Sequence, residues 1–364
     1  MTGRLALSRP LLDWLRQDAA WSRLPAGLRA RITWQAGWGS LNARLSQALD
    51  HGAADPTVLQ DPLLIAGPWR SGTTVMHELL TAATGCATPQ TWQCMNACAF
   101  QLGAPRAATV ALARPMDGLE IRSDSPQEDE FALLTLGVPS AYRAFWMPHR
   151  IGELHATLWP AFWQADATWL AAWEGFLRGV LRSAASARQP LILKSPNHSF
   201  RLPAILDRFP ASSVVWMARP AGDVFLSNRK MWRAMFALHG VTTESDPLAL
   251  DRFLAAALAA SAQVLRWCLE RLPPHRFCVV RQTDLLAHPD ATTAAVCAQL
   301  RRAHDLSSPA YLQAAARVGR MRVDRYPPAP VAPEVAAAIR ALDDAQVAVP
   351  MAPIRADQPR RAGE

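Results

Sequence analysis

The pattern of hydrophobic positions in the first fifty residues predicts helices. Apolar residues recur every three or four positions through LLDWLRQDAAW and then LRARITWQAGWGSLNARLSQAL, within residues 10–50. A polar loop follows, and residues 63–67 (LLIAG) form an unbroken apolar run. A run of this kind without alternation is typical of a strand that is buried in a parallel sheet.

The rest of the chain alternates between predicted strands and helices. A helix is predicted over residues 72–84, and residues 86–189 mix Trp-rich helices with loops. Further strands are predicted at 190–194, at 212–218 and within 276–286, and the helices between them include residues 248–272. This order predicts an α/β fold of three layers, with a central parallel sheet and extra N-terminal and middle helices.

The same pattern divides the chain into three expected segments. Residues 1–60 are an N-terminal helical segment packed on the core, and residues 61–326 are the α/β domain. Residues 327–364 are a Pro-rich C-terminal helix and tail.

Composition narrows the class of protein. Half of the residues are hydrophobic, which excludes a disordered chain. Neither a signal peptide nor a stretch of bilayer-spanning length is apparent, so we expect a cytoplasmic protein. The six cysteines form no CxxC pair, and although Cys94 and Cys98 can share a helical face, no further ligands are spaced for zinc. We therefore expect free thiols and no metal site.

The net charge of +8 and the pI near 9.7 fit an acidic substrate or cofactor. The basic residues are dispersed without a dense block, which argues against a nucleic-acid partner. Only two of them are lysines, Lys194 and Lys230. A lysine kept at a predicted strand end, as Lys194 is, therefore draws attention.

The stretch GPWRSGTT lies between the first predicted strand and its helix. Gly67 and Gly72 have the spacing of a P-loop, but Thr73 and Thr74 follow where a nucleotide-binding P-loop has lysine and a hydroxyl residue. The turn still presents backbone N–H groups at a helix N-terminus, which is an anion site. This motif predicts a fold of the P-loop type.

A P-loop kinase or NTPase would need that lysine, and it would need a strand ending in aspartate to hold magnesium. The candidate strand at 212–218 ends instead in Arg219, and Ser227 follows on the next helix. Parallel strands end at one edge of a sheet, where ligands bind. We expect Arg70, Lys194 and Arg219 to meet there and to bind a ligand with phosphates at two separated points.

The order of motifs resembles the sulfotransferase superfamily, specifically bacterial sulfotransferases that use 3′-phosphoadenosine 5′-phosphosulfate (PAPS). The matching stretches run from about residue 60 to about residue 326: GPWRSGTT, RPMDGLEIRSDSPQEDEFAL, LILKSPNHSFRLPAILDRFP, RPAGDVFLS and TDLLAHPDAT. The resemblance implies PAPS as the sulfuryl donor, without a metal. It also implies that the 5′-phosphosulfate is held by Arg70, Ser71, Gly72, Thr73 and Thr74, and the 3′-phosphate by Arg219 and Ser227.

The same resemblance implies a catalytic role for Arg70, at the bridging oxygen, and for Lys194, at the transferring group. The general base stays open between Glu128 and His198. Tyrosylprotein sulfotransferases have a glutamate after the P-loop helix, where this chain has Gln90 and Gln93.

Several other residues receive structural interpretations. Asp129 and Glu130 are expected at the surface, His77 as a packing or surface residue, and Asp117 in a turn. The stretch with Arg320, Arg322 and Arg325 is expected to help bind the 3′-phosphate or to be solvated.

The resulting hypothesis is a bacterial PAPS-dependent sulfotransferase that acts on a hydroxyl of an apolar small molecule or lipid. Two alternatives are a P-loop kinase with a degenerate motif and a catalytically silent nucleotide-binding protein. The sequence leaves open a homodimer, and whether the N-terminal helices cover the acceptor or mediate dimerisation.

Overall fold

The computed structural model describes residues 8–50, 58–102, 112–113, 120–153, 165–183, 190–243, 246, 248–319, 321, 326 and 330–347. Its centre is a four-stranded, wholly parallel sheet with the order β4-β1-β5-β6. The strands are β1 (Leu63–Ala66), β4 (Ile192–Lys194), β5 (Ser213–Ala218) and β6 (Phe277–Arg281). The four predicted strands and the parallel α/β class are confirmed.

The register brings the carboxyl ends of the strands to one edge. Leu63 of β1 lies opposite both Ile192 of β4 and Ser213 of β5, and Val214 lies opposite Phe277 of β6. The residues that follow β1, β4 and β5 therefore leave the sheet on the same side. These are the segments that carry the predicted site residues.

Alternating strand residues fill two hydrophobic cores, one on each face of the sheet. Leu63 and Ile65 of β1 pack with α4 (Thr73–Thr84), α14 (Pro289–Gln299) and α15 (Pro309–Val318). Leu64 and Ala66 belong to the larger core on the other face. Helices that contribute to this second core include α10 (His198–Arg208), α11 (Ala221–His239) and α12 (Ala249–Arg271). Two apolar faces covered by helices give the predicted three layers.

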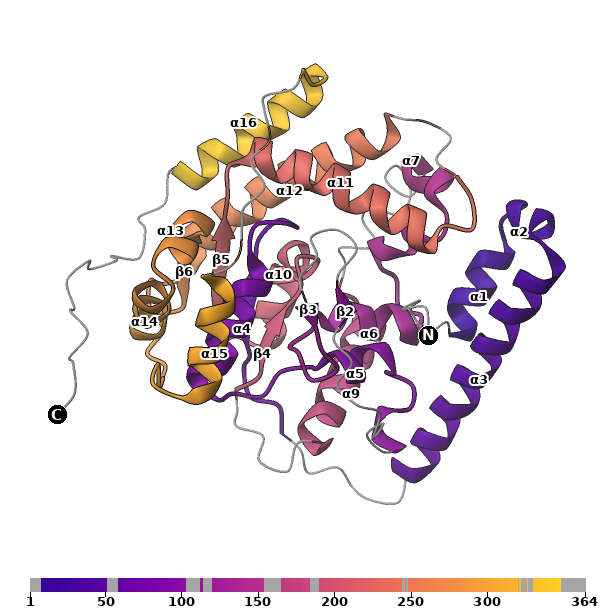
Figure 1. Cartoon of the computed structure of the whole chain (residues 1–364), viewed down its shortest axis with the longest axis horizontal. Coiled ribbons are helices and arrows are strands. Elements are labelled where there is room, and N and C mark those ends of the chain that lie inside the picture. Colours follow the sequence, from indigo (N-terminus) through magenta and orange to yellow (C-terminus); the bar gives the residue numbers. More distant parts are fainter. Residues whose placement is uncertain are drawn as a thin grey trace.

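The N-terminal helices are confirmed and form a hairpin at one side of the molecule (Figure 1). They are α1 (Arg9–Arg16), α2 (Ala20–Arg23) and α3 (Ala26–Asp50). Leu11 and Leu15 of α1 are fully buried in the larger core, and α1 contacts both α3 and α6 (Asp129–Leu136). The hairpin is thereby attached to the helix that begins beside Glu128.

Several of the middle and C-terminal elements contribute to the larger core. The remaining elements are α5 (Thr91–Met95), η1 (Phe100–Leu102), β2 (Leu112–Ala113), β3 (Glu120–Ile121), η2 (Ala141–Phe145), η3 (Pro148–Arg150), α7 (Ile151–Glu153), α9 (Ala167–Ser183), α13 (Gln282–Ala287) and α16 (Pro333–Val347). Helix α16 packs along α12, which is consistent with a C-terminal segment docked on the α/β domain. The boundaries at residues 60 and 326 stay a prediction.

One helix among the described residues, α12, has the length and apolar composition of a membrane-spanning segment. Half of its most apolar window is buried, and Phe253, Ala262 and Leu265 have no exposed surface. It packs against α11 and α16, as the core helix of a folded domain does.

Candidate active site

The P-loop is anchored from three sides before any ligand is considered. Gly67 has φ 126°, and a Cβ there would lie 2.6 Å from the Met217 carbonyl oxygen, so only glycine fits. Ser199 Oγ accepts from the Gly67 N–H at 2.8 Å and donates to its carbonyl oxygen at 3.0 Å. Trp69 is buried, and Asn228 Nδ2 donates to the Trp69 carbonyl oxygen at 2.9 Å. These contacts fix the loop between β1 and α4.

Ser71 is used inside the loop. Its hydroxyl donates to the Pro68 carbonyl oxygen at 2.7 Å, and its side chain is fully buried. The next residue, Gly72, has φ 97° and is the N-cap of α4. Glycine supplies no side chain to cap the helix, so the first turn of α4 presents its positive dipole end and its backbone N–H groups.

The structure brings together the two arginines and the serine that the sequence assigned to one ligand. Arg70 Nε donates to Ser227 Oγ at 3.1 Å, and Arg219 Nη1 donates to the Arg70 carbonyl oxygen at 3.0 Å. Arg70 has φ 70°, an uncommon conformation for a residue with a side chain. Two guanidinium groups held beside the start of α4 make this edge of the sheet a candidate anion site.

The C-terminal helix α16 supports this arginine cluster through contacts that no sequence pattern predicts. Gln346 Oε1 accepts from the Arg219 N–H at 2.9 Å, and Gln346 Nε2 donates to the Arg219 carbonyl oxygen at 3.2 Å. Asp343 Oδ1 accepts from the Ala221 N–H at 2.8 Å, in the first turn of α11. Burial raises the pKa of Asp343. Nothing in a helix pattern predicts which distant backbone a polar side chain will contact.

Lys194 lies at the centre of a chain of polar contacts. Its Nζ is 2.7 Å from Glu128 Oε1 and 3.4 Å from Thr74 Oγ1. Tyr142 OH donates to Glu128 Oε2 at 2.8 Å and accepts from Trp69 Nε1 at 3.1 Å. The chain therefore links the P-loop helix, the end of β4 and Glu128.

Glu128 has the position of a helix cap but not the contacts of one. It is the N-cap residue of α6, yet its carboxylate oxygens accept from Lys194 and Tyr142, and it makes no capping hydrogen bond within the described region. Its side chain keeps 14% of its surface exposed, whereas that of Lys194 keeps 1%. Burial, followed by the charge of Glu128, raises the pKa of Tyr142, which therefore stays a hydrogen-bond donor.

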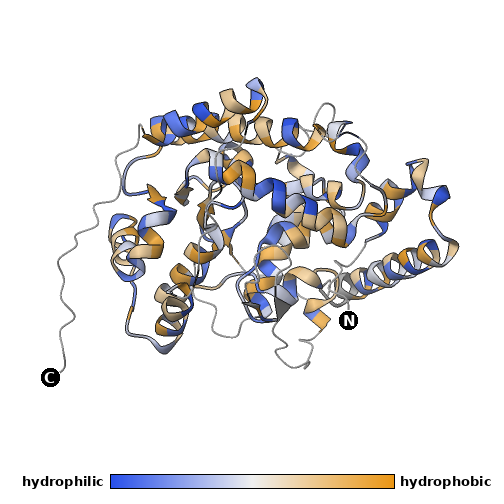
Figure 2. Cartoon of the chain, turned by 45° about the horizontal axis from the view of Figure 1, so that its top comes forward, coloured by the Kyte–Doolittle hydropathy of each residue, from blue (hydrophilic) through white to orange (hydrophobic). Residues whose placement is uncertain are grey.

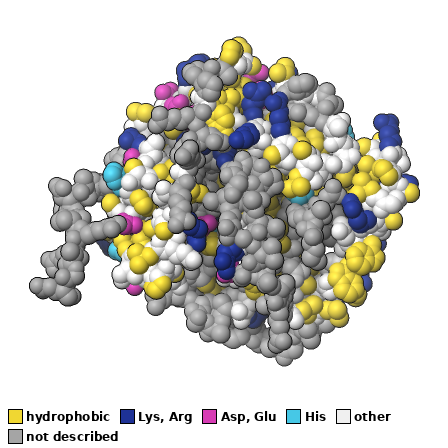
Figure 3. Space-filling view, viewed as in Figure 1, with side chains coloured by type: hydrophobic (Ala, Val, Ile, Leu, Met, Phe, Trp, Pro, Cys, Tyr) yellow, Lys and Arg dark blue, Asp and Glu magenta, His cyan; other side chains and the backbone are white. Residues whose placement is uncertain are grey.

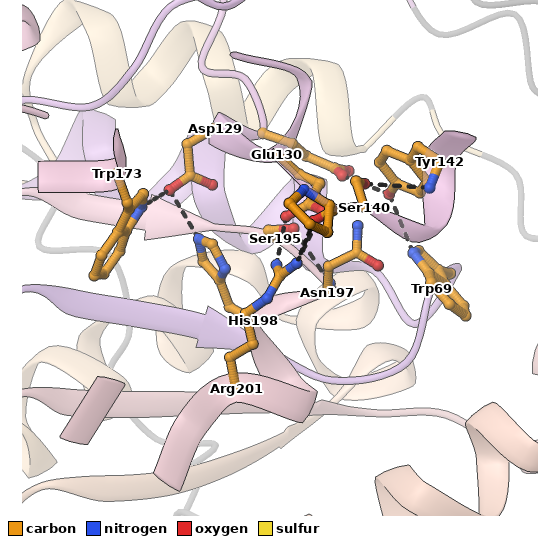
Figure 4. Close-up of polar contacts among 12 residues, drawn as sticks. Trp69, Asp129, Glu130, Ser140, Tyr142, Trp173, Ser195, Asn197, His198 and Arg201 are labelled. Atoms are coloured by element: carbon orange, nitrogen blue, oxygen red, sulfur yellow. Dashed lines mark hydrogen bonds and ion pairs between the residues drawn. The ribbon is translucent and has the colours of Figure 1, made fainter. Parts of the chain in front are cut away.

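His198 lies in a different environment. It is buried, and its Nε2 is 2.8 Å from Asp129 Oδ2, which also accepts from Trp173 Nε1 at 2.6 Å. Burial pushes the pKa of Asp129 up, but the charge and hydrogen bond of His198 and the Trp173 bond outweigh it, so that pKa is lowered. Figure 4 shows Asp129, Trp173 and His198 together on one side, with Tyr142 and Trp69 on the other.

The expectation that Asp129 and Glu130 lie at the surface is wrong. Both have no exposed surface, and Glu130 Oε2 accepts from Arg201 Nη1 at 2.6 Å. Carboxylates are buried when cations and hydrogen-bond donors replace water. His198 and Arg201 lie three residues apart on one face of α10 and meet the two adjacent carboxylates at the start of α6.

The glutamines in place of a family glutamate have a structural use. Gln90 is the N-cap of α5, and Gln93 Oε1 accepts from the Gln90 N–H at 2.8 Å, forming a capping box. His77 is a packing residue: it is fully buried, and its Nε2 is 2.6 Å from Thr88 Oγ1. Burial, and then the charge of Lys194, lower the pKa of His77 to about 3.

The remaining expectations concern thiols, metals and two basic or acidic stretches. All six cysteines are free, and no group of His, Cys, Asp or Glu among the described residues is arranged to hold a metal ion. Burial raises the pKa of Cys98 to about 11. Asp117, Arg320, Arg322 and Arg325 lie outside the described residues.

Comparison with known proteins identifies the family. The sequence profile of the sulfotransferase family matches residues 62–305, about two thirds of the chain. The chain belongs to the sulfotransferase family. Membership of this family does not favour the P-loop kinase alternative for a chain that has Thr73 where a nucleotide-binding P-loop has lysine.

Individual relatives agree with this assignment. The omega-hydroxy-beta-dihydromenaquinone-9 sulfotransferases Stf3 of Mycobacterium bovis and Mycobacterium tuberculosis are each 30% identical over 254 residues. The match covers 68% of this chain and 63% of those proteins, so slightly less than two thirds of their length is represented.

Solved structures show the same fold. Sulfotransferase STF9 from Mycobacterium avium superimposes with a TM-score of 0.67 at 16% identity, covering 96% of this chain and 98% of the other. Sulfotransferase STF1 from Mycobacterium tuberculosis H37Rv gives 0.59 at 17% identity, covering 92% and 90%.

Proposed function

We propose that this chain is a sulfotransferase that moves the sulfuryl group of PAPS to a hydroxyl of an apolar, lipid-like acceptor. The observation that carries the proposal is the joining of Arg70, Arg219 and Ser227 at the edge of the sheet in a chain of the sulfotransferase family. The family does not favour the kinase alternative, and the Lys194–Glu128 pair argues against a silent binder.

The chain offers anion-binding groups suited to such a donor. The N-terminal turn of α4, from Gly72 to Thr74, would hold the 5′-phosphosulfate with Arg70, and Arg219 with Ser227 would hold the 3′-phosphate. When bound, PAPS supplies an activated sulfuryl group on a phosphate leaving group. We assign Ser71 to shaping the loop, because its hydroxyl is already bonded to Pro68.

Arg70 and Lys194 would stabilise the charge that develops during transfer. A fixed cation at the bridging oxygen lowers the barrier when negative charge accumulates there. Arg70 is held in the left-handed region by the contacts of the loop, and Lys194 is buried beside Thr74. Both cations are positioned in advance by the fold.

We assign the general base to Glu128 and not to His198. A base must reach the acceptor hydroxyl, and Glu128 is the partly exposed carboxylate that touches Lys194. Tyr142 and Lys194 hold its two oxygens in place. His198 is sealed behind Asp129 and Trp173, and we assign it a structural role.

The acceptor class rests on two observations of unequal weight. The Stf3 relatives carry a hydroxylated menaquinone derivative in their name, which supports a lipid-like acceptor here. The Trp-rich middle section supports it less, because Trp169 and Trp173 are fully buried in the core. The mycobacterial relatives also support a bacterial enzyme, and the cytoplasm remains our expectation.

Calorimetric titration of the purified chain with adenosine 3′,5′-bisphosphate tests the donor site. We expect binding without metal, and a loss of about tenfold or more in affinity for Arg219→Ala, because a buried charge-assisted contact is removed. Arg252→Ala, at an exposed ion pair with Asp246, is the matched control. Binding of ATP with magnesium in preference to the bisphosphate would overturn the proposal.

Turnover is tested in a second step with radiolabelled PAPS and a panel of long-chain and isoprenoid alcohols. We expect sulfated product from at least one apolar alcohol, without added metal. Bisphosphate binding without sulfation of any member of the panel or of a polar alcohol would favour the silent nucleotide-binding alternative.

A further inference from the structure

The outer face of α3 carries an exposed hydrophobic stripe. Trp34, Trp38, Leu41 and Leu45 are spaced by four, three and four residues, which places them on one side of a helix. They keep 68%, 57%, 48% and 48% of their surface exposed, although the opposite side of α3 buries Ile32 and Ala36. The two indole rings stack with their centroids 6.3 Å apart. In Figure 3 hydrophobic side chains form a patch over α3 at the right of the molecule.

The charged residues of α3 before its last position are all arginines. Arg31 lies three residues before Trp34, and Arg44 lies three residues after Leu41, and both are exposed at the flanks of the stripe. No acidic residue occurs between Ala19 and Leu49. Hydrophobic and hydrophilic residues alternate along α3 (Figure 2). Apolar residues lie both on the side that packs on the protein and on the exposed side.

We propose that this α3 stripe docks the protein on the surface of a membrane that contains anionic lipids. An interfacial helix lies in the membrane plane with Trp and Leu among the acyl chains and basic residues toward the headgroups. Tryptophan is enriched at that level of the bilayer because its ring is apolar and its N–H is polar. The stripe has this composition, and the flanking arginines complement a negatively charged surface.

A second copy of the chain is the competing occupant, and charge disfavours it. An interface built symmetrically from the same face would bring the arginines of both copies together. No carboxylate within residues 19–49 is available to neutralise them. An anionic membrane supplies the opposite charge, whereas residues 19–49 of a second copy supply the same one.

The attachment of α3 relates docking to the proposed chemistry. The stripe helix contacts α1, and α1 contacts α6, which begins at the Glu128 cap. Membrane docking would bring an enzyme for a lipid-like acceptor to the phase that holds such molecules. The docking itself needs neither donor nor acceptor. The docking proposal can therefore fail while the sulfotransferase proposal stands, and the sulfotransferase proposal can fail while the docking proposal stands.

Sedimentation of the purified full chain with vesicles tests the proposal. We expect binding to phosphatidylcholine vesicles that contain phosphatidylglycerol, and a reduction of about tenfold or more for the double variant Trp34→Ser/Trp38→Ser, since buried apolar area sets the binding strength. Leu312→Ser, at a residue of α15 that is 56% exposed, is the matched control and is expected to bind as the wild type does. Thermal unfolding of each variant checks that the fold is kept.

Two further measurements decide the outcome. The first compares vesicles that contain phosphatidylglycerol with vesicles of phosphatidylcholine alone. The double variant Arg31→Gln/Arg44→Gln should lose the preference for phosphatidylglycerol and bind these two vesicle types equally. Failure of the wild type to sediment with either vesicle, or equal binding by the tryptophan variant, overturns the proposal. A dimer in light scattering that the tryptophan variant converts to a monomer also overturns it and makes the stripe a self-interface.

Discussion

Three consecutive acidic residues at the start of α6 lie in two contrasting environments. Glu128 keeps an exposed edge, and its partners Lys194 and Tyr142 belong to the candidate site. Asp129 and Glu130 have no exposed surface, and each contacts a basic residue of α10, His198 and Arg201 respectively. The same chemical group thus serves at a reactive edge at one position and inside the core at the next.

The difference teaches how a chain can separate reactivity from stability over a short distance. Successive residues at a helix start point in different directions, so neighbours in sequence meet different partners. A carboxylate with partial exposure can exchange a proton with a substrate. A carboxylate that is buried with its counter-charge cannot exchange a proton with a substrate. Removing such a carboxylate leaves the partner charge buried without a carboxylate or water to compensate it.

Removing the reactive carboxylate is expected to have the largest effect. Glu128→Gln keeps the shape and one acceptor oxygen for Lys194 or Tyr142, but its amide group cannot take a proton. We expect kcat for sulfation of the best alcohol in the panel to fall by about 10²–10⁴-fold, with adenosine 3′,5′-bisphosphate affinity within about twofold. Initial rates with saturating PAPS measure this.

Two comparisons make the first prediction specific. Tyr142→Phe removes one hydrogen bond from Glu128 and should cost less activity than Glu128→Gln does. His198→Gln tests the competing base in parallel. Full activity in Glu128→Gln together with inactivity in a well-folded His198→Gln would reverse our assignment of the base.

The buried ion pair of Glu130 and Arg201 is expected to have a large effect on the free energy of unfolding. Glu130→Leu leaves the Arg201 guanidinium buried beside Trp169 without its carboxylate, and we expect the free energy of unfolding to fall by about 3–5 kcal/mol. Removing both charges in Glu130→Leu/Arg201→Met should recover most of that loss. Urea denaturation measures each variant.

An exposed pair provides the contrast for this second prediction. Arg252 and Asp246 keep about half of their side-chain surface exposed, so Arg252→Ala should cost less than about 1 kcal/mol. An equally small loss in Glu130→Leu would show that enclosure of the pair does not distinguish the two regions.

The comparison also shows where sequence was sufficient. Arg70, Arg219 and Ser227 could be placed together because P-loop spacing and strand ends are local features that a parallel sheet brings to one edge. The four strands and the N-terminal helices could be predicted from hydrophobic periodicity, which is also a local feature of the sequence. Local rules were enough wherever the sheet itself did the positioning.

Sequence was insufficient where distant side chains meet. Tyr142 and Gln346 carry no motif, and their roles depend on which elements pack against the site. The burial of Asp129 and Glu130 was missed because acidic residues favour exposed helix starts in general. The sequence signal for this burial was the spacing of His198 and Arg201, which places both on one helix face. That signal can be interpreted only when the fold shows that this face meets the start of α6.

His77 feels the charges of both Lys194 and Asp129, and it is expected to make the stability depend on pH. Burial, and then the Lys194 charge, lower the pKa of His77 from 6.5 to about 3, while the charge of Asp129 opposes this. Folded protein keeps His77 neutral, whereas unfolded protein binds a proton there below pH 6.5. The stability is therefore complete above pH 6.5 and is lost as pH falls toward 3, by at most about 1.4 kcal/mol per pH unit. His77→Gln should flatten this slope in urea denaturation between those limits, and the exposed His275→Gln controls for the loss of a histidine. An unchanged slope in His77→Gln would mean that His77 takes up its proton equally in both states, so that neither burial nor the Lys194 charge reaches it.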